Sequence, residues 1–217
     1  IIPLGEWILR RACLDAQIWP EHIKIAVNLS PAQFMKNDVA SMVKRIVRET
    51  GINPTRLELE ITESLLLQDT DNIIEQLTRI RDFGVTIAMD DFGTGYSSLS
   101  YLSRFPFDKI KIDQSFVQSL DTDPSVAAIV NSIVSLGRTL SMTVIAEGVE
   151  TETQANILRA SGCKHVQGFL YGKPVPTSAS ITEAPKTYDQ MMAKLSEEFP
   201  APPPADLEKI KGGVKVA

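Results

Sequence analysis

Short apolar segments alternate with longer amphipathic stretches along most of the chain. The short segments are rich in Val, Ile and Leu, which is typical of strands buried on both faces of a parallel sheet. They predict strands over residues 24–29, 57–62, 85–90, 109–113, 143–147 and 165–169. Because strands that alternate with helices build a parallel sheet covered by helices, the pattern predicts an α/β fold, either doubly wound or closed as a barrel.

The amphipathic stretches carry helix signals at their ends. Ser30 with Pro31 is a typical N-terminal signal, and Thr151 with Gln154 forms a capping box. Glycines follow the last apolar position of most of these stretches. Together the signals predict helices over residues 31–51, 71–84, 124–137 and 152–162, preceded by a helix within residues 5–19.

Polar side chains stand at the carboxyl end of nearly every predicted strand. They are Asn28, Glu60, Asp90 with Asp91, Lys111, Glu147 and Gln167. A TIM-like (β/α)₈ barrel builds its active site at that end of the strands. No glycine fingerprint for a dinucleotide phosphate follows an early strand, so the barrel is favoured over the doubly wound sheet. Since a barrel has eight strands and the sequence shows about six, we expect a barrel that lacks its first strand or strands.

Five of these side chains are oxygen donors: Asn28, Glu60, Asp90, Asp91 and Glu147. Hard divalent cations such as Mg²⁺ and Mn²⁺ prefer carboxylate and amide oxygens. Two such ions about 3.5–4 Å apart can clamp a phosphodiester and activate a water molecule. Any one of these acids alone would more often be a helix cap or a surface group. Their recurrence at equivalent strand ends therefore predicts a two-metal site.

Lys111 is the basic residue that could join this cluster. Strand alternation puts Lys109, Lys111 and Asp113 on one face of their segment and two isoleucines on the other. If the lysine face points into the barrel, the ammonium of Lys111 lies near the carboxylates and can orient water or a phosphate oxygen. If that face points outward, it is a solvated strand face. The sequence leaves both alternatives open.

Composition narrows the class of protein. The 217 residues carry a net charge of −5 without a Lys/Arg patch, which argues against DNA binding. Cys13 and Cys163 are too few for a disulfide framework and are expected to pack as small apolar residues. Because no apolar run reaches the ~20 residues of a membrane span and no signal peptide opens the chain, a cytoplasmic location is expected.

The last part of the chain differs from the rest. Strand signals stop after residue 176, and the segment that follows is rich in Pro, Lys and Gly. We therefore predict a barrel domain over residues 1–176 and a C-terminal extension over residues 177–217. The extension is expected to hold one short helix over residues 187–198 and to be mobile beyond Pro200.

Several longer motifs stand in a characteristic order. They are "VNLSP", "LEITES", "DDFGTGYSSL", "KIDQSFV", "VIAEGVET" and "QGFLYGKP". In this order and spacing the chain resembles the EAL-domain family over residues 1–176. That family consists of bacterial phosphodiesterases that linearise the second messenger cyclic di-GMP.

The resemblance implies roles for individual residues. Asn28, Glu60 and Asp90 match metal ligands, while Asp91 and Glu147 match ligands that reach a second metal. The resemblance implies catalytic roles for Asp91, Lys111, Glu147 and Gln167. Among these, Glu147 matches the general base, Lys111 matches the lysine that touches the metal-bound water, and Gln167 matches a position that supports the site.

Two further acids match positions outside the ligand set. Glu63 resembles the glutamate that braces the "DDFGTGYSSL" loop and so couples dimerisation to activity. Glu150 matches the second acid of "EGVE". The resemblance further implies a homodimer through the loop from Asp91 to Tyr101, and sensory or GGDEF-type domains upstream that a membrane anchor could carry.

The chain also departs from the family pattern. The Glu-Ala-Leu segment, with a metal-binding Glu and a nearby substrate-binding Arg, is absent, and Lys164 replaces the usual acid after "GC". These departures fit either part of a longer protein or a shortened descendant, and an open barrel predicts weak activity and self-association of the isolated chain.

Three functions follow from the sequence. The first is metal-dependent hydrolysis of cyclic di-GMP to linear pGpG. The second is a catalytically inactive cyclic di-GMP receptor or protein-interaction module on the same scaffold. The third is a different metal hydrolase with a TIM barrel, because a fold alone does not fix a function.

Overall fold

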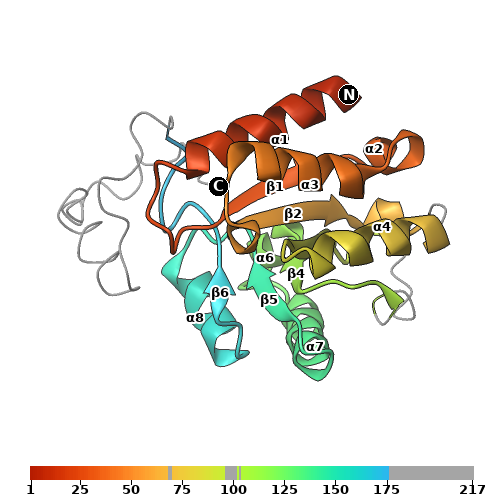
Figure 1. Cartoon of the computed structure of the whole chain (residues 1–217). Helices are drawn as coiled ribbons and strands as arrows, with labels where there is room; N and C mark the ends of the chain where they lie inside the picture. The colour runs from red at the N-terminus through yellow and green to blue at the C-terminus, as the bar shows by residue number, and fades with distance from the viewer. Residues whose placement is uncertain (68–69, 96–101, 103, 176–217) are drawn as a thin grey trace.

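Six parallel strands form one sheet in the order in which they occur along the chain (Figure 1). The computed structural model describes residues 1–67, 70–95, 102 and 104–175. The strands are β1 (Ile25–Leu29), β2 (Leu57–Thr62), β3 (Thr86–Phe92), β4 (Lys109–Ile112), β5 (Thr143–Ala146) and β6 (His165–Val166). Every predicted strand is present, which confirms the α/β fold.

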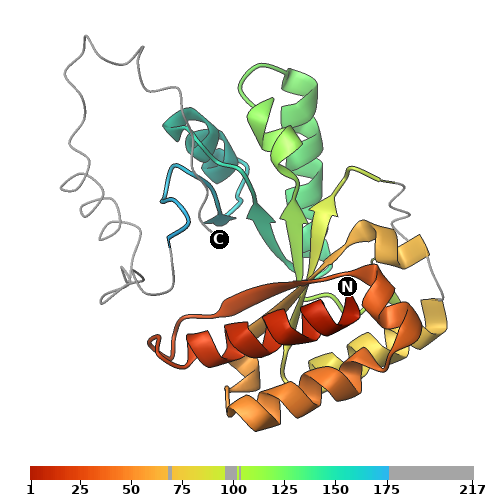
Figure 2. The ribbon, with the colours of Figure 1, turned by 90° about the horizontal axis from the view of Figure 1, so that it is seen from above.

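Helices connect the strands. They are α1 (Ile2–Ala16), α2 (Pro31–Lys36), α3 (Val39–Thr50), α4 (Thr70–Asp82), α6 (Gln114–Gln118), α7 (Pro124–Thr139) and α8 (Glu152–Ala160). Seen from above, α1 to α4 lie on one side of the spreading strands and α7 and α8 on the other (Figure 2). Two 3₁₀ turns, Pro54–Arg56 and Glu63–Leu67, flank β2.

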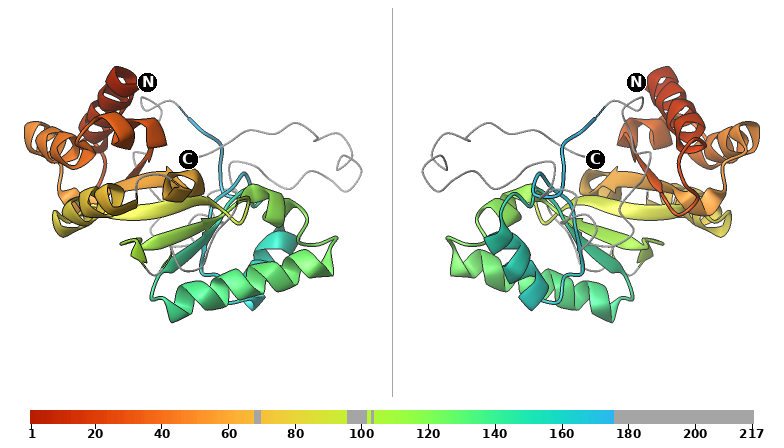
Figure 3. Two further views of the ribbon diagram at one scale, coloured as in Figure 1. Left: turned by 90° about the vertical axis from the view of Figure 1, so that its right-hand side faces the viewer. Right: turned by 90° about the vertical axis from the view of Figure 1, so that its left-hand side faces the viewer.

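The two faces of the sheet differ in polarity. Alternate residues such as Leu59, Met89 and Ile110 are fully buried in one apolar core with the helices. The residues between them, among them Glu60 and Lys111, face the opposite side. Figure 3 shows the curved layer of strands with helices outside it. Since no pairing joins β1 to β6 within the described residues, the sheet is a barrel-like layer that is open on one side.

Several element boundaries differ from the prediction. The helix predicted over residues 31–51 is two helices, because the backbone at Asn37 is extended and Asp38 starts a new helix by accepting a hydrogen bond from Ser41 N. Gly137 does not end its helix. It lies inside α7, where a Cβ would stand 2.2 Å from Val144 Cγ2. Glycine is therefore required because α7 packs closely against β5 at this point, and not because the helix ends there.

The prediction also differs from the structure at several strand ends and lacks one helix. β3 runs on through Asp91 and Phe92, β5 ends before Glu147, and β6 is shorter than predicted. Asp113 is not the last residue of β4 but the N-cap of α6, which the sequence reasoning missed. The predicted helix over residues 187–198 and the extension around it lie outside the described residues.

Two smaller expectations can be compared with the structure. Cys13 and Cys163 are both free and buried, as predicted. None of the helices in the described part of the chain has the length and apolar character needed to cross a membrane.

The capping box of α8 gives a first testable prediction. Thr151 Oγ1 accepts from Gln154 N at 3.2 Å, and the buried Gln154 side chain accepts from Thr151 N at 3.1 Å. We expect Thr151→Ala to lower the free energy of unfolding by about 1 kcal/mol, because a helix N–H loses its acceptor. Urea denaturation measures this loss. Thr151→Ser keeps the hydroxyl and serves as control; an equal loss in both variants would contradict the assignment.

Candidate functional site

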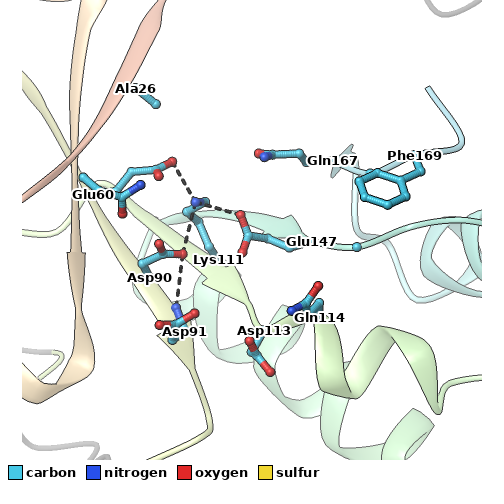
Figure 4. Close-up of a pocket in the computed structure, with 13 residues that line it drawn as sticks. Ala26, Glu60, Asp90, Asp91, Lys111, Asp113, Gln114, Glu147, Gln167 and Phe169 are labelled. Atoms are coloured by element: carbon cyan, nitrogen blue, oxygen red, sulfur yellow. Dashed lines mark hydrogen bonds and ion pairs between the residues drawn. The ribbon is translucent and has the colours of Figure 1, made fainter. Parts of the chain in front are cut away.

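A cavity of about 340 Å³ opens at the carboxyl ends of the strands (Figure 4). Seven of the nine site residues predicted from the sequence line it: Asn28, Glu60, Asp90, Asp91, Lys111, Glu147 and Gln167. They come from six different strands or from the residue directly after a strand. The parallel order of the sheet therefore brings together side chains that are distant in the sequence.

The ammonium of Lys111 lies among three carboxylates. Its Nζ is 2.7 Å from Glu60 Oε1, 2.7 Å from Glu147 Oε1 and 3.1 Å from Asp90 Oδ1 (Figure 4). Lys111 is 3% exposed, so of the two orientations that the sequence left open, the inward one is correct. Burial alone would lower the pKa of Lys111, but Glu60 and Glu147 outweigh it and raise that pKa. The lysine is therefore charged at every pH at which the protein would work.

The adjacent aspartates both line this cavity because β3 is irregular at that point. In a regular strand, neighbouring side chains point to opposite faces. Here the pairing with β4 shifts between Met89 and Phe92, and Asp91 adopts the left-handed conformation with φ 56°. Such a bulge re-aims a side chain. As a result, carboxylate oxygens of Asp90, Asp91 and Glu147 lie within 4.8 Å of one another.

Crowding of these acids perturbs their protonation. Burial raises the pKa of Glu60 and that of Glu147, and the nearby Lys111 only partly opposes this effect. Burial also raises the pKa of Asp91, and the neighbouring charge of Asp90 adds to the increase. The carboxylates are thus held close together at a cost that a further cation would relieve.

The donor set fits a divalent cation. Asp90, Asp91 and Glu147 offer carboxylate oxygens from one small region, and Asn28 and Glu60 add an amide and a further carboxylate at the same cavity. Among the described residues that line the cavity, Lys111 is the one basic residue, against five acids. Hard ions such as Mg²⁺ and Mn²⁺ prefer this kind of oxygen environment.

The other two predicted residues do not line the cavity. Glu63 is buried behind the end of β3, where its Oε2 accepts a hydrogen bond from Gly93 N at 3.4 Å. A Cβ on Gly95 would lie 2.9 Å from Glu63 Oε1, so this carboxylate also contacts the next glycine. Glu150 is exposed at the start of α8, where its backbone N–H donates to Gln154. Residues 96–101 of the expected dimerisation loop lie outside the described residues.

Sequence reasoning missed other residues that line the cavity. They are Ala26, Asp113, Gln114, Gly148, Gly168 and Phe169. Gly168 lies so close to the loop after β5 that a Cβ would stand 2.2 Å from Val149 N and O. The spacing of Asp113 and Ser115 is a helix-cap signal, and it could have indicated the helix that carries Gln114.

A second ion pair lies one step below Lys111 on the same face. Lys109 Nζ contacts Glu58 Oε2, and the Glu58 side chain is 5% exposed against 20% for Lys109. Glu58 and Glu60 alternate along β2 as Lys109 and Lys111 alternate along β4. The ionic pairing between these strands therefore extends beyond the residues that line the cavity.

The chain is similar in sequence to a known family and to known proteins. The family model described as EAL domain matches residues 1–174. The bifunctional diguanylate cyclase/cyclic di-GMP phosphodiesterase MucR of Pseudomonas aeruginosa is 44% identical over 180 residues, covering 81% of this chain and 26% of MucR. The cyclic di-GMP phosphodiesterase NbdA of the same organism is 38% identical over 180 residues, covering 81% of this chain and 23% of NbdA. The chain thus spans about a quarter of the length of these relatives.

Solved structures are similar as well. The PaMucR phosphodiesterase in complex with c-di-GMP superposes with a TM-score of 0.77 at 43% identity, covering 82% of this chain and 73% of the other. The EAL domain of Mycobacterium smegmatis DcpA gives 0.76 at 40% identity, with 81% of each chain covered. The manganese/cy-diGMP complex of Klebsiella pneumoniae BlrP1 gives 0.75 at 32% identity, covering 81% of this chain and 45% of BlrP1.

Proposed function

Because this chain belongs to the EAL domain family, we propose that it hydrolyses cyclic di-GMP to the linear dinucleotide pGpG with divalent cations. One observation carries the proposal: Lys111 and the carboxylates of Glu60, Asp90, Asp91 and Glu147 meet in one cavity. A fold alone would not support an activity, whereas this arrangement supplies the charges that phosphodiester hydrolysis needs.

We propose Asn28, Glu60, Asp90, Asp91 and Glu147 as the residues that would hold Mg²⁺ or Mn²⁺. Such ions, when bound in pairs, supply Lewis-acid polarisation of a phosphoryl oxygen and lower the pKa of water. Support for a divalent ion comes from the acidic cluster and from the manganese complex of the similar BlrP1. The proposal covers both ions, magnesium and manganese.

The chain's own groups have separate roles in this proposal. Lys111 places a fixed positive charge on the cavity wall, where it orients the phosphate oxygens. Glu147 accepts the proton of the attacking water. Gln167, on the loop after β6, orients the substrate with its amide.

Residues around the cavity support these groups. Glu63 would fix the backbone after Asp91 through its contacts with Gly93 and Gly95. Glu150 stays a prediction based on the resemblance alone, since its exposed side chain lies outside the cavity. We further propose a domain boundary near residue 176, a cytoplasmic setting, a homodimer through residues 91–101 and attachment to sensory or GGDEF-type domains, as in multidomain signalling relatives.

The assay that tests the function uses the whole chain with cyclic di-GMP and Mn²⁺. We expect chromatography to detect pGpG, EDTA to stop its formation, and added Mn²⁺ to restore it, because the crowded carboxylates need a divalent ion to bind phosphate. Circular dichroism before and after EDTA controls for loss of fold.

Two other outcomes would contradict this function and favour the alternatives. Calorimetric binding of cyclic di-GMP by the folded protein without any pGpG would indicate a receptor. Asn28 is exposed on β1, an edge strand of the described sheet. This observation favours the second candidate, because no strand of the described sheet lies beyond β1 to hold this proposed ligand in place. Cleavage of other phosphate esters but not of cyclic di-GMP would indicate a different hydrolase.

A further inference from the structure

The short helix α6 contacts the backbone that follows two of the proposed metal ligands, Asp91 and Glu147. It follows β4 directly, and β4 lies between β3 and β5 in the sheet, so α6 starts between the carboxyl ends of those two strands. Asp113 caps it by accepting from Ser115 N at 3.0 Å, and Val117 anchors it in the apolar core with no exposed surface. α6 is therefore fixed at its start and along its inner face.

Phe116 of α6 packs against the backbone that follows Asp91. A Cβ placed on Gly93 would lie 2.8 Å from Phe116 Cε2 and 3.0 Å from Cζ. Gly93 has φ 97°, and Asp91, two residues earlier, has φ 56°. The ring of Phe116 thus lies directly against the irregular end of β3. It can approach this closely because Gly93 has no side chain.

The same helix contacts the other ligand segment through Gln114. A Cβ placed on Gly148 would lie 2.6 Å from Gln114 Cβ and 3.3 Å from its Cα. Gly148 has φ 69° and directly follows Glu147. One five-residue helix therefore lies against the glycine next to Glu147 and the glycine two residues after Asp91.

We infer that Phe116 is a positioning residue that holds the bulge of β3, and with it the carboxylate of Asp91, at the distance from Glu147 that a divalent cation requires. This inference rests on the proposed function. A non-glycine residue in the left-handed conformation is strained and persists only where its surroundings fix it. Thr94 Oγ1 donates to Asp91 O at 2.9 Å and Glu63 accepts from Gly93 N, so Phe116 completes the set of groups that fix this turn.

A merely structural role for Phe116 makes a different prediction. The ring is half-buried and packs against the core, so its removal lowers stability in either case. If Phe116 only fills space, cation binding by the folded protein stays unchanged. If it positions Asp91, cation affinity falls even where the protein is fully folded, because groups that orient ligands control affinity.

Phe83 provides the matched control. It is also a half-buried phenylalanine that packs against the core, and it lies before β3, at the opposite end of the strand from Asp91, where Lys44 and Arg48 stand over its ring. Phe83→Ala and Phe116→Ala therefore remove the same side chain from similar burial. They differ in whether the lost ring contacts the ligand segment.

The experiment measures Mn²⁺ binding to the whole chain by electron paramagnetic resonance of the free ion, without substrate. We expect Phe116→Ala to raise the Mn²⁺ dissociation constant about ten-fold, Phe116→Leu to raise it less, and Phe83→Ala to leave it unchanged. Thermal unfolding in EDTA identifies the folded fraction of each variant. Should Phe116→Ala fail to fold, the Leu variant decides.

Wild-type affinity in the folded Phe116 variants, or an equal loss in Phe83→Ala, would overturn the positioning role. A wild-type chain that binds no Mn²⁺ would instead overturn the proposed metal site itself. The two failures are therefore distinguishable within one measurement.

Discussion

Glu147→Gln is expected to lower the rate of cyclic di-GMP hydrolysis about 10³-fold while the fold stays intact, the loss typical of a removed general base. The substitution keeps the size of the side chain but removes the carboxylate that lies 2.7 Å from Lys111 Nζ and belongs to the acidic cluster with Asp90 and Asp91. Steady-state kinetics at saturating Mn²⁺ measure the loss. Glu152→Gln, an exposed acid in the first turn of α8, is the matched control.

The pH dependence of the rate follows from the same residue. Because burial raises the pKa of Glu147 in the metal-free protein, this carboxyl there takes up a proton at a higher pH than an ordinary glutamate, whose pKa is about 4.3. Below its pKa the group can neither accept a proton nor hold a cation, so hydrolysis by the wild type should fall as the pH decreases through that value. The variant should lose the part of this acidic limb that comes from Glu147, while the part that comes from Glu60 and Asp91, whose pKa values burial also raises, remains. A variant with full activity, or an unchanged pH profile, would exclude Glu147 as the base.

Lys111→Met is expected to lower the free energy of unfolding in EDTA at pH 7 by about 3–5 kcal/mol, because it leaves buried charges without their partner. Lys111 Nζ contacts Glu60, Asp90 and Glu147 within 3.1 Å, and its side chain is almost completely buried. Its pKa is raised in the folded state, so this contribution is fully present at pH 7 and is lost only as the pH rises through the folded pKa. Urea denaturation measures the change.

Two further measurements make this prediction specific. The loss should shrink as the pH falls, since Glu60 and Glu147 have raised pKa values and are neutralised by protons early in an acid titration. Mn²⁺ should restore part of the stability, because a ligand that binds only the folded state stabilises it. Lys109→Met, which removes the more exposed partner of Glu58, should cost less. A stability of Lys111→Met equal to that of the wild type would show that these ion pairs contribute nothing.

The strands and helix caps could be predicted because their signals are local. The alternation within residues 57–62 and the capping residues Thr151 and Gln154 depend on neighbours a few positions away, and the structure confirms both. The strand ends then predicted the cavity, since parallel strands in chain order place Glu60, Asp90 and Glu147 at one edge.

Other features depend on contacts between distant segments and could not be predicted. The inward direction of Lys111 depends on Glu60, Asp90 and Glu147, which come from other segments of the chain. The bulge at Asp91 depends on its pairing with β4 and on contacts with Glu63 and Phe116. Likewise, no local pattern separates a glycine that ends a helix from Gly137, which lies where α7 touches β5.

The proposed ligand set is distributed over separate strands that follow one another in chain order: β1, β2 and the end of β5 each supply one oxygen donor, β3 supplies two, and β4 supplies none. No short peptide cut from this protein would contain more than a small part of the coordination sphere. The denatured polypeptide should therefore compete poorly for manganese, and bound manganese should act as a reporter of complete folding. Titrating the ion against partly denatured samples would then count native molecules directly.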